Sequence, residues 1–381
     1  MRDNRVEERV VNHPLPDPLT MNDGSAVKSK KQWEARRREL LEMFTEEIYG
    51  RMPEQVSYLE SKVLEVKPDA LNGLATRKRV AIYLDREHKV WIDMLLYTPN
   101  SAKGKKSPVF LGINFWGNSC CTNEPDVLEA NGEERARYCV FEPQVRGFNA
   151  RRWPLEAILS RGYGVATFYR GDVCPDYDDV AATGVRSLYP KDSGDVPGRD
   201  QWGAVSAWAW GLSRAMDYLE TDDDVDSARV AVIGHSRLGK TALWAGANDR
   251  RFAMIVSNDS GCTGATLSRR DFGETVKMIN WHFPHWFCDN YDRYNDCPEA
   301  LPVDQHELIS LCAPRPVCVG SADGDLNADP EGERLSLEAA RPVYELFGAA
   351  DRLNYHIRKG GHDILLEDWE YYLDHADRYM K

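Results

Sequence analysis

The apolar residues of this chain fall into short runs separated by amphipathic stretches. Apolar runs of about four to eight residues predict strands, which we place at 63–66, 77–84, 90–97, 109–114, 163–169, 230–233, 253–257, 316–321 and 353–357. Apolar residues recurring every three or four positions predict helices at 31–49, 153–160, 201–219, 238–247 and 365–379. Strands and helices alternate from residue 109 onward. This order predicts an α/β fold, with a mostly parallel sheet between layers of helices.

Two segments stand outside this pattern. Residues 1–30 are polar and contain Pro14, Pro16 and Pro18, so we expect an extended N-terminal arm followed by one domain over 31–381. Residues 176–200 are rich in Asp, Gly and Pro and predict a long loop. Long loops in compact domains are commonly functional.

Composition and charge exclude several classes of protein. The net charge of −13 makes nucleic acid or an anionic membrane surface an unsuitable partner. No apolar run approaches membrane-spanning length, and the first residues lack the apolar segment of a secretory signal. The nine cysteines are scattered, with no C-x-x-C pair, which argues against a disulfide framework and against a zinc site. Free cysteines suit a reducing compartment.

The stretch 229–240 carries the first candidate chemistry. A buried strand at 230–233 leads into Gly234, then Ser236, then a helix. Strand, tight glycine turn, serine and helix form the nucleophile elbow of α/β-hydrolases. The usual G-x-S-x-G spacing is not met, because the second glycine is Gly239. The alternative is an ordinary turn between strand and helix, with a capping serine.

A serine nucleophile needs a base and an acid, and both are present further along. The strand at 316–321 runs into a loop containing Asp323 and Asp325, and the strand at 353–357 runs into Gly-Gly-His362. The carboxyl ends of parallel strands meet at one edge of the sheet, where Ser236 is also expected. The order Ser, Asp, His is that of α/β-hydrolases, so the sequence predicts a serine hydrolase.

These residues resemble a known family. Gly234-His-Ser-Arg-Leu-Gly-Lys240 is similar to the G-C-S-R-x-G-K signature of glucuronoyl esterases. Further segments similar to the bacterial branch occur at 14–19, 146–154, 257–265, 268–274, 283–288, 301–306 and 313–316. The resemblance covers nearly the whole chain. It implies an α/β-hydrolase fold, a three-layer αβα sandwich with a mostly parallel central sheet.

The resemblance also implies an activity. Glucuronoyl esterases hydrolyse the ester between 4-O-methyl-glucuronic acid on xylan and lignin alcohols, without a metal or cofactor. The expected partner is therefore glucuronoxylan or another glucuronate ester, and we favour a monomer. Members that act on plant walls are secreted, whereas the cysteines of this chain allow a cytoplasmic location.

Residue roles follow from the same resemblance. Ser236 is the nucleophile and His362 the base, while Arg237 matches an arginine that helps to bind the oxyanion. A guanidinium can stabilise a carbonyl oxygen as it becomes negative. Lys240 and Glu274 match positions that bind the sugar hydroxyls.

The acid remains open between two positions used in the family. One follows the strand after the nucleophile helix, where this chain has Asp259, and the other follows the next strand, where it has Asp325. We favour Asp325, because an aspartate at the first position is shorter than the glutamate often found there. Asp323 is a weaker candidate because it lies nearer its strand.

Two departures from the family pattern affect the expected site. The fungal branch has a disulfide where this chain has His235 and Asp363, so that bridge is not expected. Bacterial members often carry a sugar-stacking tryptophan where this chain has Asn327. An amide has no comparable ring face. Trp286 is a candidate replacement.

Two other functions are kept as alternatives. An acetylxylan esterase, or another carbohydrate ester hydrolase, would use the same triad on a different ester. A catalytically inactive sugar-binding module would keep the fold without the chemistry, and the presence of Ser236, Arg237 and His362 argues against it.

Overall fold

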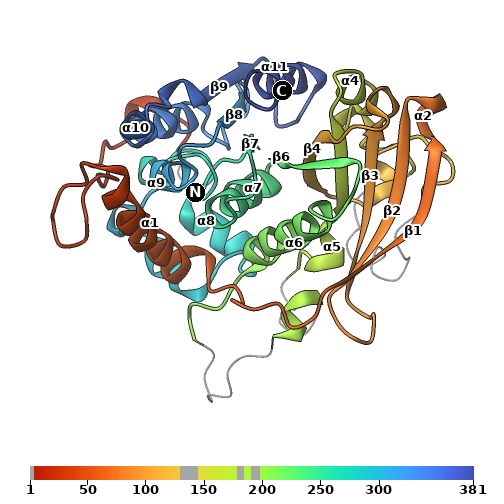
Figure 1. Ribbon diagram of the computed structural model, residues 1–381. Coiled ribbons are helices and arrows are strands. Elements are labelled where there is room, and N and C mark those ends of the chain that lie inside the picture. Colours follow the sequence, from red (N-terminus) through yellow and green to blue (C-terminus); the bar gives the residue numbers. More distant parts are fainter. Residues whose placement is uncertain (1–3, 129–144, 178–183, 190–197) are drawn as a thin grey trace.

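The computed structural model describes residues 4–128, 145–177, 184–189 and 198–381. These residues form a nine-stranded sheet in the order β1-β2-β3-β5-β4-β6-β7-β8-β9 (Figure 1). The strands are β1 (Glu60–Asp69), β2 (Ala75–Tyr83), β3 (Trp91–Pro99), β4 (Ser107–Asn114), β5 (Gly164–Tyr169), β6 (Val225–His235), β7 (Met254–Asn258), β8 (Val317–Ala322) and β9 (Leu353–Arg358). Neighbours from β5 to β9 run parallel, whereas β1, β2, β3 and β5 pair antiparallel.

Helices cover both faces of this sheet. They are α1 (Lys30–Phe44), α2 (Ala70–Gly73), α4 (Leu155–Ser160), α5 (Arg170–Val173), α6 (Ala204–Leu219), α7 (Arg237–Asn248), α8 (Val276–His282), α9 (Gln305–Ser310), α10 (Pro330–Phe347) and α11 (Leu366–Tyr379). The core on one face includes side chains of α1, α6, α7, α9 and α10, and the core on the other face includes those of α4 and α11. The predicted three-layer α/β-hydrolase fold is confirmed.

Alternation along the strands explains the two cores. In β4, Val109 and Leu111 point to the α6–α7 face, whereas Phe110 between them points to the α4–α11 face. All three side chains are fully buried. A strand covered by helices on both faces can be apolar throughout, which is why this run carries no polar alternation.

One long helix was not predicted from the sequence. Helix α10 begins after Asp329, whose side chain accepts a hydrogen bond from Gly332 N, and has Pro330 in its first turn. It ends at Gly348, which has a φ of 70°. An Asp cap, an early proline and a terminal glycine are helix boundary signals. They were therefore present in the sequence, and the helix they delimit carries a residue of the site.

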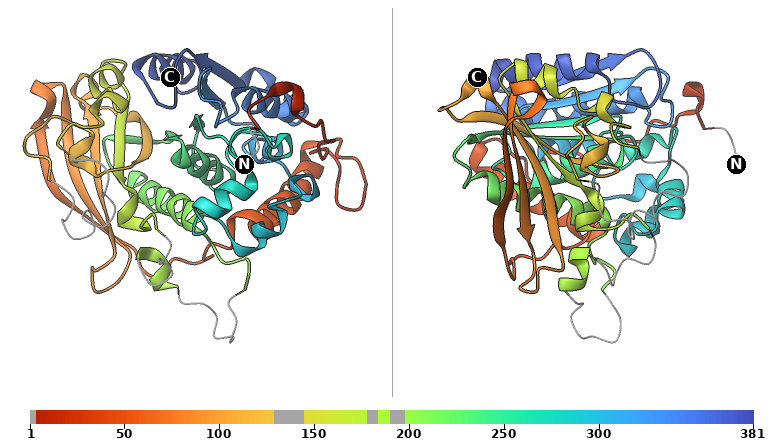
Figure 2. Two further views of the ribbon diagram at one scale, coloured as in Figure 1. Left: turned by 180° about the vertical axis from the view of Figure 1, so that it is seen from behind. Right: turned by 90° about the vertical axis from the view of Figure 1, so that its right-hand side faces the viewer.

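The N-terminal arm lies along the loops that follow β7 and β8. Asn4 Nδ2 donates to the carbonyl oxygens of Asp271 and Gly273, and Arg5 donates to Oδ1 of Asn327 at 2.6 Å. Figure 2 shows the start of the arm on the side of the molecule opposite the C-terminus. The arm is thus held at the same edge of the sheet as the loops of the candidate site.

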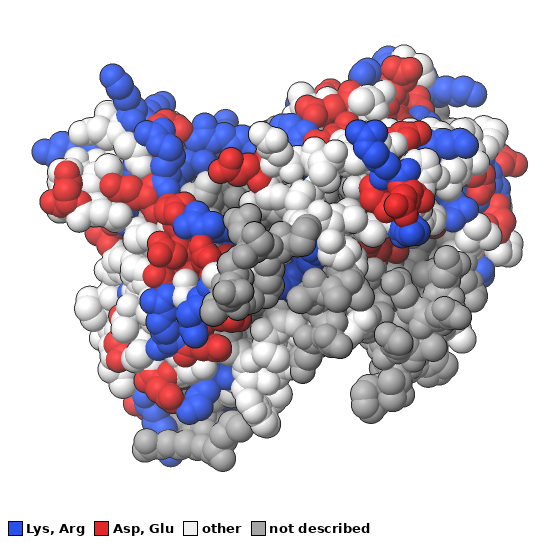
Figure 3. All heavy atoms as spheres, turned by 90° about the horizontal axis from the view of Figure 1, so that it is seen from below, with Lys and Arg blue, Asp and Glu red and all other residues white. Residues whose placement is uncertain are grey.

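The surface carries charges of both signs. On the face seen in Figure 3, acidic and basic side chains are intermingled, without a broad patch of one sign. Within the described residues, no helix combines the length and apolar character needed to traverse a bilayer.

Candidate active site

Ser236 occupies a sharp turn between β6 and α7. Its backbone has φ 59° and ψ −130°, and its N–H donates to the carbonyl oxygen of Asn258 at 2.9 Å. A Cβ atom at Gly234 would lie 1.9 Å from the carbonyl oxygen of Leu238, so only glycine fits this approach of strand to helix. The predicted nucleophile elbow is therefore formed. It places Ser236 at the N-terminus of α7, where the helix dipole favours negative charge.

His362 is bound by Asp325. Oδ2 of Asp325 lies 2.5 Å from Nδ1 of His362, and the aspartate is 6% exposed. The loops after β8 and β9 are joined by their backbones, because Gly324 N donates to Gly360 O and Gly360 N donates to Oδ1 of Asp323, each at 2.9 Å. A proton on Nδ1 leaves Nε2 of His362 able to accept one. Asp323 thus orders the loop, and Asp325 contacts the histidine.

The ring of His362 lies beside the residue that precedes the nucleophile. Its centroid is 4.6 Å from that of His235. Nδ1 of His235 lies 3.1 Å from Oδ1 of Asn258, and burial lowers the pKa of His235 well below its ordinary value. His235 is therefore neutral near pH 7, which avoids a second fixed cation beside an imidazolium.

Asp259 is in the same cluster but lies in a different environment. It is 1% exposed, and burial, aided by the nearby Glu333 carboxylate, raises its pKa to about 8. Its Oδ2 accepts long hydrogen bonds from Arg358 Nη2 (3.3 Å) and Asp363 N (3.2 Å), and its buried Oδ1 has no partner. Asp259 is thus mostly protonated near pH 7, whereas Asp325 holds the direct contact to His362.

A metal ion is a possible occupant on distance alone. Asp259, Asp325 and His362 each offer one ligand atom, and these atoms lie within 4.8 Å of one another. A bound cation needs deprotonated ligands. Asp259 is protonated near neutral pH and Nδ1 of His362 is engaged by Asp325, so the donor set suits a triad better than a metal centre.

Glu333, on α10, organises the two acid-bearing loops and was missed from the sequence. Its Oε1 accepts from the backbone N–H groups of Ser260 and Gly261, both at 2.9 Å, and its Oε2 accepts from Ser321 Oγ at 2.5 Å. The side chain is fully buried, which raises its pKa to about 7. It therefore joins the loop after β7 to the end of β8.

Arg237, the residue after the nucleophile, is held by Asp176. Its Nη1 binds Oδ2 of Asp176, and its guanidinium lies over the rings of Trp286 (4.6 Å) and Phe283 (5.1 Å). Burial would raise the pKa of Asp176, but Arg170 and Arg237 outweigh burial and hold that pKa well below its ordinary range. Asp176 is therefore a permanent anion that positions Arg237.

Sequence reasoning had no means of finding Asp176, which begins the segment predicted as a long loop. Residues 178–183 and 190–197 of that loop lie outside the described residues. Oδ1 of Asp176 also receives hydrogen bonds from His285 Nε2 (2.8 Å) and Trp286 Nε1 (2.7 Å). Only the folded chain brings these segments together.

Trp286 is placed differently from a sugar-stacking platform. It is 2% exposed, with Phe283 stacked parallel to it at 3.8 Å and Arg237 over its ring. The expectation that Trp286 replaces the family's exposed tryptophan finds no support in this geometry. Its indole instead fixes Asp176 and Arg237. At the position of that tryptophan, Asn327 accepts its hydrogen bond from Arg5 of the arm.

Lys240 and Glu274 lie together near the nucleophile helix. Nζ of Lys240 donates to the carbonyl oxygens of Ser260 (2.6 Å) and Cys262 (2.5 Å) and lies 3.5 Å from Oε2 of Glu274. Lys240 is 3% exposed, whereas the Glu274 side chain is 25% exposed. Glu274 is the member of the pair that a ligand can reach directly. The position of the family disulfide holds His235 and Asp363, and the eight cysteines within the described residues are free.

Comparisons with known proteins agree with this geometry. A family model described as glucuronyl esterase of fungi matches residues 162–348. The chain is 44% identical to the carbohydrate esterase MZ0003 of an unknown prokaryotic organism, over 99% of this chain and 92% of that protein. It is 27% identical to the 4-O-methyl-glucuronoyl methylesterase 1 of Wolfiporia cocos, over 92% and 76% of the two chains.

Solved structures lead to the same family. A glucuronoyl esterase from Solibacter usitatus matches with a TM-score of 0.90 at 42% identity, over 98% of this chain and 100% of that one. A promiscuous CE15 esterase from a marine bacterial metagenome matches with a TM-score of 0.90 at 42% identity, over 99% and 100%. With nearly full-length relatives at this identity and an elbow, histidine and acid in the expected order, the chain belongs to the glucuronoyl esterase family of carbohydrate esterases.

Proposed function

We propose that this protein is a serine esterase that hydrolyses esters of glucuronic acid or 4-O-methyl-glucuronic acid, with Ser236, His362 and Asp325 as its triad. The observation that carries the proposal is the Asp325–His362 hydrogen bond beside the elbow of Ser236. The names of the similar proteins supply the ester class.

The proposed mechanism is acyl transfer in two steps. Oγ of Ser236 attacks the ester carbonyl carbon while Nε2 of His362 takes the hydroxyl proton. The tetrahedral intermediate collapses, its bond to the alcohol oxygen breaks, and His362 donates the proton to the departing alcohol. Water then attacks the acyl-enzyme, His362 again takes the proton and returns it to Ser236, and the free uronic acid leaves.

The negative charge of the tetrahedral intermediate needs donors that are already in place. Arg237 follows the nucleophile directly and is held by Asp176, Trp286 and Phe283, so little reorganisation is required as charge develops. Burial lowers the pKa of Arg237, yet the Asp176 carboxylate opposes this shift and favours the charged form. Arg237 is thus the proposed oxyanion residue.

Recognition of the sugar is assigned to Lys240 and Glu274. The ammonium of Lys240 is anchored by two carbonyl oxygens, and Glu274 lies beside it with an accessible carboxylate. A donor next to an acceptor can bind neighbouring hydroxyls of one sugar. With Trp286 buried, this recognition depends on hydrogen bonding rather than on stacking.

An activity panel tests the proposal. The wild type and Ser236→Ala are compared on the benzyl esters of glucuronic and 4-O-methyl-glucuronic acid and on an aryl acetate. We expect the uronate esters to be preferred, with a loss of at least about a thousandfold in Ser236→Ala and in His362→Ala. A preference for the acetate would assign an acetyl esterase, and equal rates in wild type and Ser236→Ala would remove the nucleophile.

A further inference from the structure

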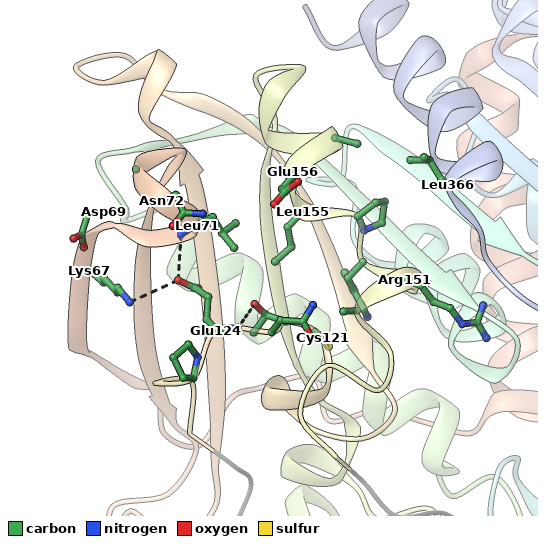
Figure 4. Close-up of a pocket in the computed structure, with 18 residues that line it drawn as sticks. Lys67, Asp69, Leu71, Asn72, Cys121, Glu124, Arg151, Leu155, Glu156 and Leu366 are labelled. Atoms are coloured by element: carbon green, nitrogen blue, oxygen red, sulfur yellow. Dashed lines mark hydrogen bonds and ion pairs between the residues drawn. The ribbon is translucent and has the colours of Figure 1, made fainter.

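A groove of about 1040 Å³ lies on the α4 side of the β1–β3 extension. Its walls come from the end of β1, the α2 turn, residues 121–125, the start of α4 and the first residue of α11 (Figure 4). None of the residues proposed for catalysis or for sugar binding at the active site lines it. It is large enough for several sugar rings, and nothing described above assigns a role to it.

One wall of the groove has an unfavourable backbone conformation that is held in place. Leu71, Asn72 and Gly73 are consecutive residues with φ values of 51°, 57° and 85°. Left-handed conformation costs about 1–2 kcal/mol for a residue such as Leu71. Oε1 of Glu124 accepts from Leu71 N at 3.1 Å, and Oε2 accepts from Arg77 Nη1 and Tyr97 Oη, each at 2.9 Å. The wall is therefore preorganised, as a ligand site requires.

The charges that line the groove indicate what it accepts. Lys67 is engaged by Asp126 at 2.7 Å and by Glu124 at 3.7 Å, and Arg151 is engaged by Asp363. Both lining cations are thus already neutralised, which leaves nothing to attract an anion. The groove is selective for neutral ligands.

Unused polar groups of the lining belong to acceptors and amides. Asp69, Asn72, Asn123 and Glu156 are exposed, and their side chains make no hydrogen bond within the described residues. Leu71, Leu155 and Trp153 add apolar surface between them. Carboxylates and amides alternating with apolar surface match the hydroxyls and the apolar ring faces of a neutral sugar chain. An aromatic polymer would leave most of these polar groups unpaired.

The groove reaches the catalytic site at one end. Arg151 lines it and binds Asp363, the residue after His362, and Leu366 follows on the same segment. Lys240 and Glu274 do not border it. A long substrate held in the groove would therefore approach the triad from the histidine side.

We infer that this groove is an accessory binding site for an uncharged stretch of polysaccharide main chain. The inference rests on the proposed function for the identity of the polymer. The groove holds part of the polymer other than the esterified uronic acid, so it raises the local concentration of polymeric substrate without touching the reacting ester.

Binding and turnover together test the groove. Xylohexaose, which contains no ester, is titrated calorimetrically into the wild type, into Asp69→Ala/Glu156→Ala, and into the control Asp223→Ala/Glu345→Ala. The control removes the same charge from exposed positions elsewhere. We expect binding near about 1 mM in the wild type and the control, and at least about tenfold weaker binding in the groove variant. On a benzyl glucuronate ester, kcat/KM of the groove variant should stay within about twofold of the wild type, whereas on ester-substituted xylan it should fall severalfold.

The outcomes separate the groove from the proposed activity. Absent binding, or equal binding in both double variants, overturns the inference. Binding of an aromatic alcohol dimer that is lost in the groove variant, with no binding of xylohexaose, overturns the sugar assignment in favour of an aromatic one. If the wild type binds xylohexaose through the groove but hydrolyses no glucuronate ester, the groove stands and the proposed activity fails.

Discussion

Oδ2 of Asp325 lies 2.5 Å from Nδ1 of His362, while the neighbouring Asp259 binds the Arg358 guanidinium and a backbone N–H. The two acids of the site are therefore unequal. One is the direct partner of the histidine, and the other is a buried carboxyl whose pKa is raised to about 8 by burial.

The first prediction follows from this inequality. Asp325→Asn should lower kcat by about 10²–10⁴, because the amide neither fixes the tautomer of His362 nor stabilises its charged form. Asp259→Asn should cost less than about tenfold, because it resembles the protonated acid already present. The residual activity of Asp325→Asn should rise with pH as Asp259 ionises. Steady-state kinetics from pH 6 to 9 measure this, and a larger loss in Asp259→Asn would move the triad acid to that position.

The second prediction concerns Arg237. Arg237→Ala should lower kcat about a hundredfold with little change in KM, because its charge is needed mainly in the transition state. Arg237→Lys is the matched control. It keeps the charge but loses the planar fork that Asp176 holds, so it should recover only part of the rate. Raised KM with normal kcat in Arg237→Ala would instead indicate ground-state binding.

The third prediction concerns stability and pH. The folded pKa of Asp259, about 8, lies above its ordinary value of 3.8. Its protonated form therefore contributes stability that is complete below pH 4 and is lost as pH rises through about 8. Asp259→Asn cannot ionise, so its Tm should fall less than that of the wild type between pH 6 and 9, by about 2 °C or more.

Differential scanning fluorimetry across this range measures the difference. The raised pKa of Glu333 acts in both proteins and largely cancels in the comparison. Parallel Tm curves for the wild type and Asp259→Asn would contradict a protonated Asp259.

The fourth prediction concerns Glu333. Glu333→Ala leaves the N–H groups of Ser260 and Gly261 buried without their acceptor, which should destabilise the protein by about 3 kcal/mol. Glu333→Gln keeps one carbonyl oxygen for these donors, so it should be milder. Denaturant unfolding compares the two variants, and kcat at pH 6 reports whether the acid loops keep their places. Equal stability of the wild type and Glu333→Ala would show that the contacts carry no net energy.

Sequence reasoning reached the part of the site that is written in local order. The elbow of Ser236, the Gly-Gly-His362 loop and the Asp325 loop each follow a predicted strand, so topology alone places them at one edge. The hydrogen bond between His362 and Asp325 agrees with the choice of Asp325.

The remaining residues depend on distant contacts that no local pattern encodes. Asp176 meets Arg237 across 61 positions of the chain, and Glu333 meets Ser260 across 73. The burial of Trp286 likewise reflects its packing against Phe283 and Arg237 rather than its sequence position. Helix α10 is different, because its boundary signals were legible.

The coexistence of two acids also bears on how such a site diverges. A buried carboxyl held beside the catalytic histidine, uncharged while the other acid is present, is neutral to selection on catalysis yet already in place. A lineage that loses the first acid then starts from a weakened enzyme rather than from an inactive one. One small adjustment that extends or ionises the second acid can restore the rate. Asp259 thus gives descendants of this chain a stepwise route by which the triad acid can migrate between strands.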